Sequence, residues 1–132
     1  MVQRILCAAA IAASLAGASC SRSDTSNPPT PTPIKPSKDP AKARELIASG
    51  ALVLDVRTPD EYREAHLPTA TNLPIDEVGA RLADVDQLAH GDKTKPIVVY
   101  CAAGGRAARA KQTLEAAGYT NIVNGGGLDD LR

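Results

Sequence analysis

The pattern of apolar and polar positions divides this 132-residue chain into short buried strands and amphipathic helices from residue 39 onward. Runs of aliphatic and β-branched residues predict strands, and apolar residues spaced three or four apart predict helices. The predicted strands cover residues 51–56, 71–74, 97–100 and 119–123. The predicted helices cover residues 40–49, 59–65, 75–88 and 106–117, and a last short helix follows a turn at the glycines 125–127.

This alternation of strands and helices is typical of an α/β domain with three layers, in which helices cover both faces of a mostly parallel sheet. In such sheets, ligands bind at the carboxyl ends of the strands. Asp55, Arg57 and Cys101 end or directly follow predicted strands. We therefore expect a functional site at that edge of the sheet.

Local signals predict where two of the helices begin. Ser37 or Asp39 can cap a helix whose first residue is Pro40. The segment T-P-D-E places a threonine at the N-cap and Glu61 at the third helical position, which is the pattern of a capping box. Glu61 is therefore expected to have a structural role.

Composition narrows the possible functions. The chain has 15 basic and 15 acidic residues, and this balance argues against broad electrostatic binding to nucleic acid. It contains no Phe and no Trp, so the core must be built from aliphatic residues and three tyrosines. The pattern of His and Cys does not predict a metal site, and no cofactor is expected.

The N-terminal region predicts export. Arg4 precedes an apolar run at residues 5–18 that ends in small residues before Cys20, as in a secretory signal. The sequence G-A-S-C resembles the bacterial lipobox, which implies that Cys20 becomes lipidated and holds a periplasmic protein on a membrane. Simple cleavage to a free periplasmic protein is the alternative. The predicted organisation is a signal at residues 1–20, a proline-rich linker at 21–38 and a folded domain at 39–132.

Cys101 is the cysteine that this organisation leaves available. Cys7 would leave with the signal and Cys20 would be capped, so an exported domain keeps one thiol. Cys101 lies between a strand and a helix, where backbone N–H groups and the helix dipole favour negative charge. A buried structural cysteine is the alternative, but the small residues A-A-G-G that follow allow the backbone to close around a reactive sulfur.

Two segments resemble rhodanese-type sulfurtransferases. Residues 54–75, L-D-V-R-T-P-D-E-Y-R-E-A-H-L-P-T-A-T-N-L-P-I, are similar to the N-terminal signature of that family. Residues 98–106, V-V-Y-C-A-A-G-G-R, are similar to its active-site loop, and Gly126 and Gly127 resemble its closing glycine motif. The resemblance implies a rhodanese-like fold over residues 39–132.

The resemblance also implies a mechanism. Cys101 would attack the outer sulfur of a donor such as thiosulfate and form a persulfide, and cyanide or a thiol would then accept that sulfur. Arg106 is expected to hold the sulfonate of the donor, and Asp55 to form a supporting ion pair with Arg57. Arg109 and Lys111 are expected on a solvated helix face. The residues expected to surround the donor are Ala102, Ala103, Gly104, Gly105, Arg106 and, as a minor contact, Arg57.

Two other functions remain open at the level of sequence. A cysteine-based phosphatase or arsenate reductase would carry a longer loop than the four residues between Cys101 and Arg106. A non-catalytic rhodanese-like module could bind a partner, or could sense sulfide or redox state through Cys101. In either catalytic or sensing form the domain is expected to be a monomer that contacts the membrane only through its N-terminal lipid.

Overall fold

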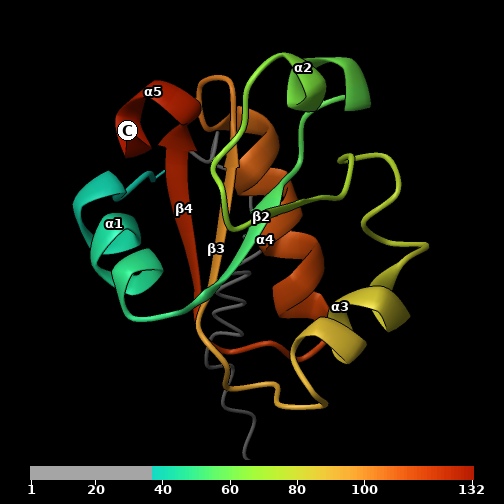
Figure 1. The fold of residues 1–132 in the computed structure, drawn as a ribbon. Coiled ribbons are helices and arrows are strands. Elements are labelled where there is room, and N and C mark those ends of the chain that lie inside the picture. Colours follow the sequence, from blue (N-terminus) through green and yellow to red (C-terminus); the bar gives the residue numbers. More distant parts are fainter. Residues whose placement is uncertain (1–36) are drawn as a thin grey trace, which may run out of the picture. The chain divides into compact units, whose positions relative to one another are not determined.

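A computed structural model describes residues 37–132 of the chain, and a four-stranded parallel sheet forms its centre (Figure 1). The strands are β1 (Leu52–Asp55), β2 (Ala70–Asn72), β3 (Ile97–Cys101) and β4 (Ile122–Gly127). They lie in the order β2-β1-β3-β4, and every neighbouring pair is parallel. The carboxyl ends of all four strands therefore meet at one edge of the sheet.

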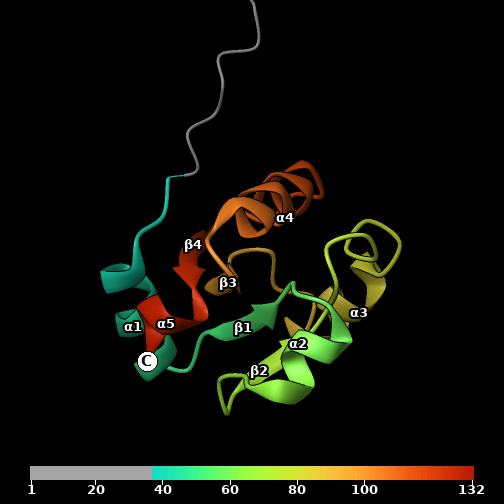
Figure 2. The ribbon, with the colours of Figure 1, turned by 90° about the horizontal axis from the view of Figure 1, so that it is seen from above.

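Helices cover both faces of this sheet (Figure 2). They are α1 (Pro40–Ala48), α2 (Pro59–Glu64), α3 (Leu82–Leu88), α4 (Gly105–Ala116) and α5 (Leu128–Leu131). Residues of α3 and α4 pack in one core cluster, whereas residues of α1 and α5 pack in the other. Tyr62 of α2 packs against the α1 and α5 cluster. The predicted three-layer α/β architecture is confirmed.

The alternation of side chains along the strands supplies both cores. Leu54 and Val99 belong to the cluster beneath α3 and α4, whereas their neighbours Val53 and Val98 belong to the cluster beneath α1 and α5. All four are at most 1% exposed. Because fully burying such a side chain contributes about 1.5–3 kcal/mol, a sheet buried on both faces can stabilise a domain without Phe or Trp.

The helix signals in the sequence act as predicted. Asp39 is the N-cap of α1, and its carboxylate accepts a hydrogen bond from the Lys42 amide. Thr58 and Glu61 form the predicted capping box at the start of α2. Gly118 follows α4 in the left-handed region, with φ of 96°, where a side chain would be strained.

The predicted helix at 75–88 is shorter than expected. Only Leu82–Leu88 is α-helical, and the residues before it form successive turns, beginning with a hydrogen bond from the Glu77 amide to the Pro74 carbonyl. Gly79 lies in these turns, and glycine weakens a helix interior. Val78 is still buried at 1% exposure. Helical spacing therefore indicated the burial of Val78 and Val85 but not the backbone conformation, and Leu88 at the end of the segment is exposed.

The last strand also differs from the prediction. It runs from Ile122 to Gly127, so the glycines expected to form a turn continue the strand instead. Cys101 pairs with Gly127 after an irregularity in the ladder between β3 and β4. A Cβ atom at Gly125 would lie 2.9 Å from a methyl carbon of Leu131 and 3.2 Å from the Ala43 Cβ, so packing favours glycine at a position where strand propensity disfavours it.

The predicted export features lie outside the residues that the structure describes. The signal at 1–20, lipidation of Cys20 and all but the last two residues of the linker 21–38 belong to residues 1–36. Of the helices between residues 37 and 132, none combines the length and the hydropathy that crossing a membrane requires.

Candidate active site

Cys101 is the last residue of β3, the strand that lies between β1 and β4. Its chain continues through a three-residue loop into α4. The residue is only 1% exposed, and its Sγ accepts a hydrogen bond of 3.0 Å from the Gly104 amide. The sulfur therefore lies where the central strand meets the N-terminus of a helix, as the sequence predicted.

The loop shields this sulfur more than the sequence indicated. Ala102 and Ala103 were expected to lie around the donor, and both residues are exposed, yet Cys101 itself is only 1% exposed. Among the amides of residues 37–132, that of Gly104 is the one that donates a hydrogen bond to Sγ. Of the backbone N–H groups expected to favour negative charge on Cys101, one thus binds the sulfur directly.

The start of α4 explains the contact between Gly104 and the sulfur. Gly104 is the N-cap of this 12-residue helix and has no side chain that could cap it. A negative charge on Sγ would lie at the positive end of the helix dipole, where it is stabilised by the unpaired amides of the first turn. The helix therefore supports a nucleophilic sulfur.

Arg106 lies in the first turn of α4 and is held by Glu61 of α2. Two guanidinium nitrogens contact the two carboxylate oxygens at 2.7 and 2.8 Å. The two side chains are 31% and 32% exposed. This ion pair is the main reason why the pKa of Glu61 falls to about 2, with help from the Thr58 amide. Sequence reasoning gave Glu61 a structural role only, and it missed this partner.

The Cys101 thiol lies within the influence of the same guanidinium. The pKa of Arg106 is raised, first by its hydrogen bonds to Glu61 and, to a smaller extent, by charge interaction with Cys101. Cys101 thus ends β3, Arg106 lies in the first turn of the helix that follows, and the structure adds the Glu61 carboxylate to this arginine.

Asp55 and Arg57 form a second pair at the same edge of the sheet. The Arg57 side chain donates to both Asp55 oxygens, at 2.7–3.1 Å, and also to the Ala65 carbonyl at 2.5 Å. The side chains of Arg57 and Asp55 are 8% and 0% exposed. This burial favours the bracing role expected for the pair over contact between Arg57 and a substrate.

The glycine-rich end of β4 supports the Cys101 loop from the other side. A Cβ atom at Gly127 would collide with the Ala102 carbonyl oxygen, so the loop backbone lies directly against the strand. Asn124 is buried in β4 and donates a hydrogen bond to the Gly104 carbonyl. The sequence analysis did not identify Asn124, because a single asparagine beside glycines carries no distinctive spacing.

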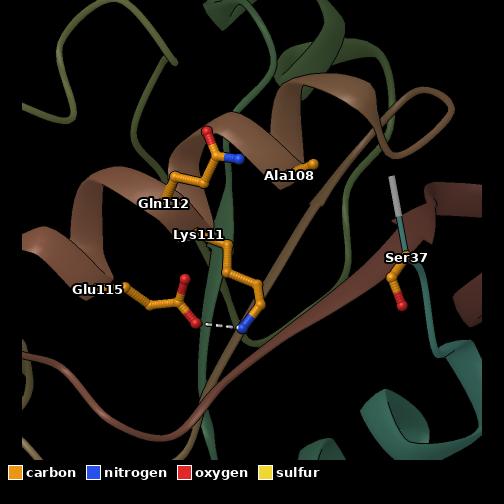
Figure 3. A pocket seen from close by; sticks show the side chains of 5 residues that line it. All are labelled: Ser37, Ala108, Lys111, Gln112 and Glu115. Atoms are coloured by element: carbon orange, nitrogen blue, oxygen red, sulfur yellow. Dashed lines mark hydrogen bonds and ion pairs between the residues drawn. The ribbon is translucent and has the colours of Figure 1, made fainter. Parts of the chain in front are cut away.

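Basic residues farther along α4 are not part of this cluster. Arg109 is exposed, and the Lys111 ammonium contacts Glu115 at 2.5 Å and the Ile122 carbonyl at 3.0 Å. Lys111 lines a shallow pocket beside α4, in which its contact with Glu115 is visible (Figure 3). The residues lining that pocket do not include Cys101.

His66 contacts a residue of its own segment. His66 Nδ1 lies 2.8 Å from the Tyr62 carbonyl oxygen, and the two rings stack at 3.9 Å. Within residues 37–132, no three His, Cys, Asp or Glu side chains gather closely enough to hold a metal ion. Cys101 and the Arg106–Glu61 pair are the chemistry-bearing groups that the sequence and the structure single out at this edge of the sheet.

Comparison with known proteins identifies the class. The family model described as a rhodanese-like domain matches residues 39–130, and the chain belongs to that family. The thiosulfate sulfurtransferase PspE of Escherichia coli (strain K12) is 41% identical over 78 residues, which cover 59% of this chain and 71% of PspE. The resemblance predicted from the two sequence segments is confirmed.

Solved structures agree with this assignment. A structure described as rhodanese with anions from E. coli has a TM-score of 0.54 and 40% identity, and the match covers 61% of this chain and 91% of the other. The human single-domain sulfurtransferase TSTD1 has a TM-score of 0.56 and 29% identity over 68% of this chain and 89% of its own.

Proposed function

We propose that this protein is a sulfurtransferase of the thiosulfate sulfurtransferase type, in which Cys101 carries sulfur from a donor to an acceptor. The observation that carries the proposal is the position of Cys101 Sγ, which accepts a hydrogen bond from the Gly104 amide at the start of α4, the helix whose first turn holds Arg106. Membership of the rhodanese-like family supports the enzyme class. The name of the relative PspE supports thiosulfate as the type of donor.

The proposed reaction consists of two displacements at sulfur. The Cys101 thiolate attacks the outer sulfur of thiosulfate, a new S–S bond forms, and sulfite leaves with the electron pair of the broken bond. The resulting persulfide then gives its outer sulfur to cyanide or to a thiolate, which restores the Cys101 thiolate. Because the enzyme holds the sulfur between the two steps, ping-pong kinetics are expected.

Arg106 is proposed to bind the sulfonate of the donor. A guanidinium carries five N–H donors in a planar fork that matches an oxyanion. Glu61 occupies two of its nitrogens, so a sulfonate can use the remaining donors or replace the carboxylate. The pair is about one-third exposed, which leaves it accessible to an anion from solvent.

The donor is proposed to reach the sulfur from the exposed side of the loop, where Ala102 and Ala103 lie. Cys101 itself is 1% exposed, so a small displacement of this loop must accompany entry of the donor. The backbone amides of the loop, with Gly104 already bound to Sγ, would then stabilise negative charge on the persulfide.

The full-length protein, purified in detergent, tests the proposal directly. With thiosulfate and cyanide it should produce thiocyanate, and Cys101→Ser should abolish this activity. Mass spectrometry after thiosulfate treatment should show one added sulfur atom on Cys101. Absence of both turnover and added sulfur in the wild-type protein would refute the proposed sulfurtransferase function. Added sulfur without turnover would instead favour the sensing module.

We also propose that the domain is exported and anchored by a lipid on Cys20. Arg4, the apolar residues 5–18 and the G-A-S-C sequence support this location. Cys20→Ala should move the protein from the membrane fraction to the soluble fraction of cells. An unchanged distribution would contradict lipid anchoring.

A further inference from the structure

Asn124 is a buried polar residue that the reaction described above does not use. It lies in β4 opposite Val99 of β3 and is 2% exposed. Its Nδ2 donates to the Gly104 carbonyl at 3.0 Å, and its Oδ1 accepts from the Gly126 amide at 2.9 Å. Both ends of the side-chain amide are therefore engaged by backbone, which fixes its orientation.

Gly104 connects Asn124 to the sulfur. The Gly104 amide donates to Cys101 Sγ at 3.0 Å, and the Gly104 carbonyl accepts from both Asn124 and the Ala108 amide. Gly104 has φ of 100°, and a glycine without a side chain can leave such a conformation at little cost. The contact from Asn124 therefore adds to the helix hydrogen bond from Ala108 in keeping the Gly104 amide directed at the sulfur.

The backbone of Gly126 and the side chain of Asn124 lie close to Gly104. A Cβ atom at Gly104 would lie 3.3 Å from the Gly126 Cα and 3.6 Å from Asn124 Oδ1. Gly126 is itself in the left-handed region, with φ of 87°, and its amide is bound by Asn124. One side chain thus holds the two glycines whose backbones meet behind the catalytic loop.

We propose that Asn124 is a positioning residue for sulfur transfer. By holding the Gly104 carbonyl, it keeps the Gly104 amide on Cys101 Sγ, where that amide stabilises negative charge on the sulfur. The inference rests on the proposed function, because this stabilisation serves a thiolate nucleophile and its persulfide.

The position requires a donor at one end of the side chain and an acceptor at the other. Aspartate has the shape of Asn124 but offers only acceptors when ionised, so it would face the Gly104 carbonyl without a hydrogen bond. It would also place a negative charge near Sγ. Serine is shorter, but its hydroxyl can donate and accept. Asn124→Asp therefore keeps the size of the side chain but removes the donor, whereas Asn124→Ser keeps a donor but reduces the size.

The experiment compares Asn124→Asp and Asn124→Ser in the full-length protein. Thiosulfate turnover gives kcat and KM, and peptide mass after iodoacetamide treatment gives the alkylation rate of Cys101 as a function of pH. We expect kcat to fall about 10- to 100-fold in Asn124→Asp, less than the loss of about 10²–10³ for removal of a direct donor. The midpoint pH of alkylation should rise, KM should change less than about 2-fold, and Asn124→Ser should be intermediate.

Val123→Ala is the matched control for stability. Val123 is half-buried in the same strand and packs against the α1 and α5 cluster, away from the Cys101 loop. The Val123→Ala variant should lower the midpoint temperature of thermal unfolding without changing kcat or the alkylation profile of Cys101. If the Asn124 variants lose activity only as far as they lose folded protein, and alkylate with the wild-type profile, the positioning role is refuted.

Alkylation also separates this inference from the proposed function. The alkylation profile of Cys101 does not depend on turnover, so a raised midpoint in Asn124→Ser, which adds no charge near Sγ, would support positioning even if the wild-type protein failed to use thiosulfate. An active wild-type enzyme whose kcat and alkylation profile are insensitive to both Asn124 changes would overturn the positioning role alone.

Discussion

Two arginine–carboxylate pairs lie at the carboxyl edge of the same sheet, and they differ in burial. Asp55 and Arg57 are two residues apart, and their side chains are 0% and 8% exposed. Glu61 and Arg106 are 45 residues apart, and their side chains are about one-third exposed. The shortest N–O distance is 2.7 Å in each pair. Geometry alone therefore does not distinguish their roles.

Burial determines what each pair can do. Removing one partner of a buried pair leaves a charge without compensation and costs about 3–5 kcal/mol, whereas an exposed pair contributes about 0–1 kcal/mol. An anion from solvent can compete with Glu61 for Arg106 at this low cost. It cannot compete in the same way for Arg57. The first pair is suited to bracing the edge, and the second is suited to exchange with a substrate.

The largest expected effect comes from Asp55→Ala. Arg57 would keep its buried position without a carboxylate, so the free energy of unfolding should fall by about 3–5 kcal/mol in urea denaturation. Glu61→Ala is the matched deletion in the exposed pair, and it should cost only about 1–2 kcal/mol, mainly through the lost helix cap. Equal losses from the two deletions would contradict the distinction by burial.

Arg106→Ala should have the next largest effect, on donor use rather than on stability. Loss of a hydrogen bond to a charged group costs about 1.5–3 kcal/mol, which corresponds to about a 10- to 150-fold decrease in kcat/KM for thiosulfate. The free energy of unfolding should change by less than about 1 kcal/mol. Steady-state kinetics and urea denaturation measure the two quantities.

Arg109→Ala provides the control for this change. It removes the same charge from an exposed position on the same helix. We expect kcat/KM to change less than about 2-fold, since screening by solvent weakens the effect of an exposed charge. A decrease as large as that of Arg106→Ala would show that general positive charge, rather than a placed guanidinium, attracts the donor.

The sequence predicted the fold well where one local signal determined the structure. The helix caps at Asp39 and Thr58 and the buried central strand are confirmed. The helix expected at 75–88 was too long, because the same spacing also arises when turns bury Val78. The glycines of β4 were assigned to a turn, because strand propensity does not take account of how closely α1 and α5 pack against this strand.

The site was less predictable than the fold, because its contacts join distant segments. The position of Cys101 followed from strand and helix boundaries alone. By contrast, Glu61 reaches Arg106 across 45 residues, and Asn124 reaches Gly104 across 20. No spacing rule within one element encodes such pairs. They depend on how α2 and β4 pack around the loop.

Glu61→Gln tests whether the exposed pair competes with the donor. Glutamine can still serve in a capping box, but it attracts Arg106 less strongly. Because such a pair is worth about 0.2–1 kcal/mol, KM for thiosulfate should fall by about 1.4- to 5-fold. Glu77→Gln, which alters an exposed pair with Arg81, should leave KM unchanged. An increase in KM would show that Glu61 orients Arg106 for the donor.

The smallest expected effect is the acid dependence of stability that Glu61 provides. Its pKa falls from an ordinary value of 4.5 to about 2 in the folded protein, chiefly through Arg106. A lowered folded pKa stabilises the protein above the unfolded pKa, and this contribution is lost as the pH falls through the folded pKa. The urea midpoint of the wild-type protein should therefore exceed that of Glu61→Gln above about pH 4.5, and the difference should disappear toward about pH 2. A difference that stays constant across this window would mean that the charge of Glu61 does not stabilise the fold.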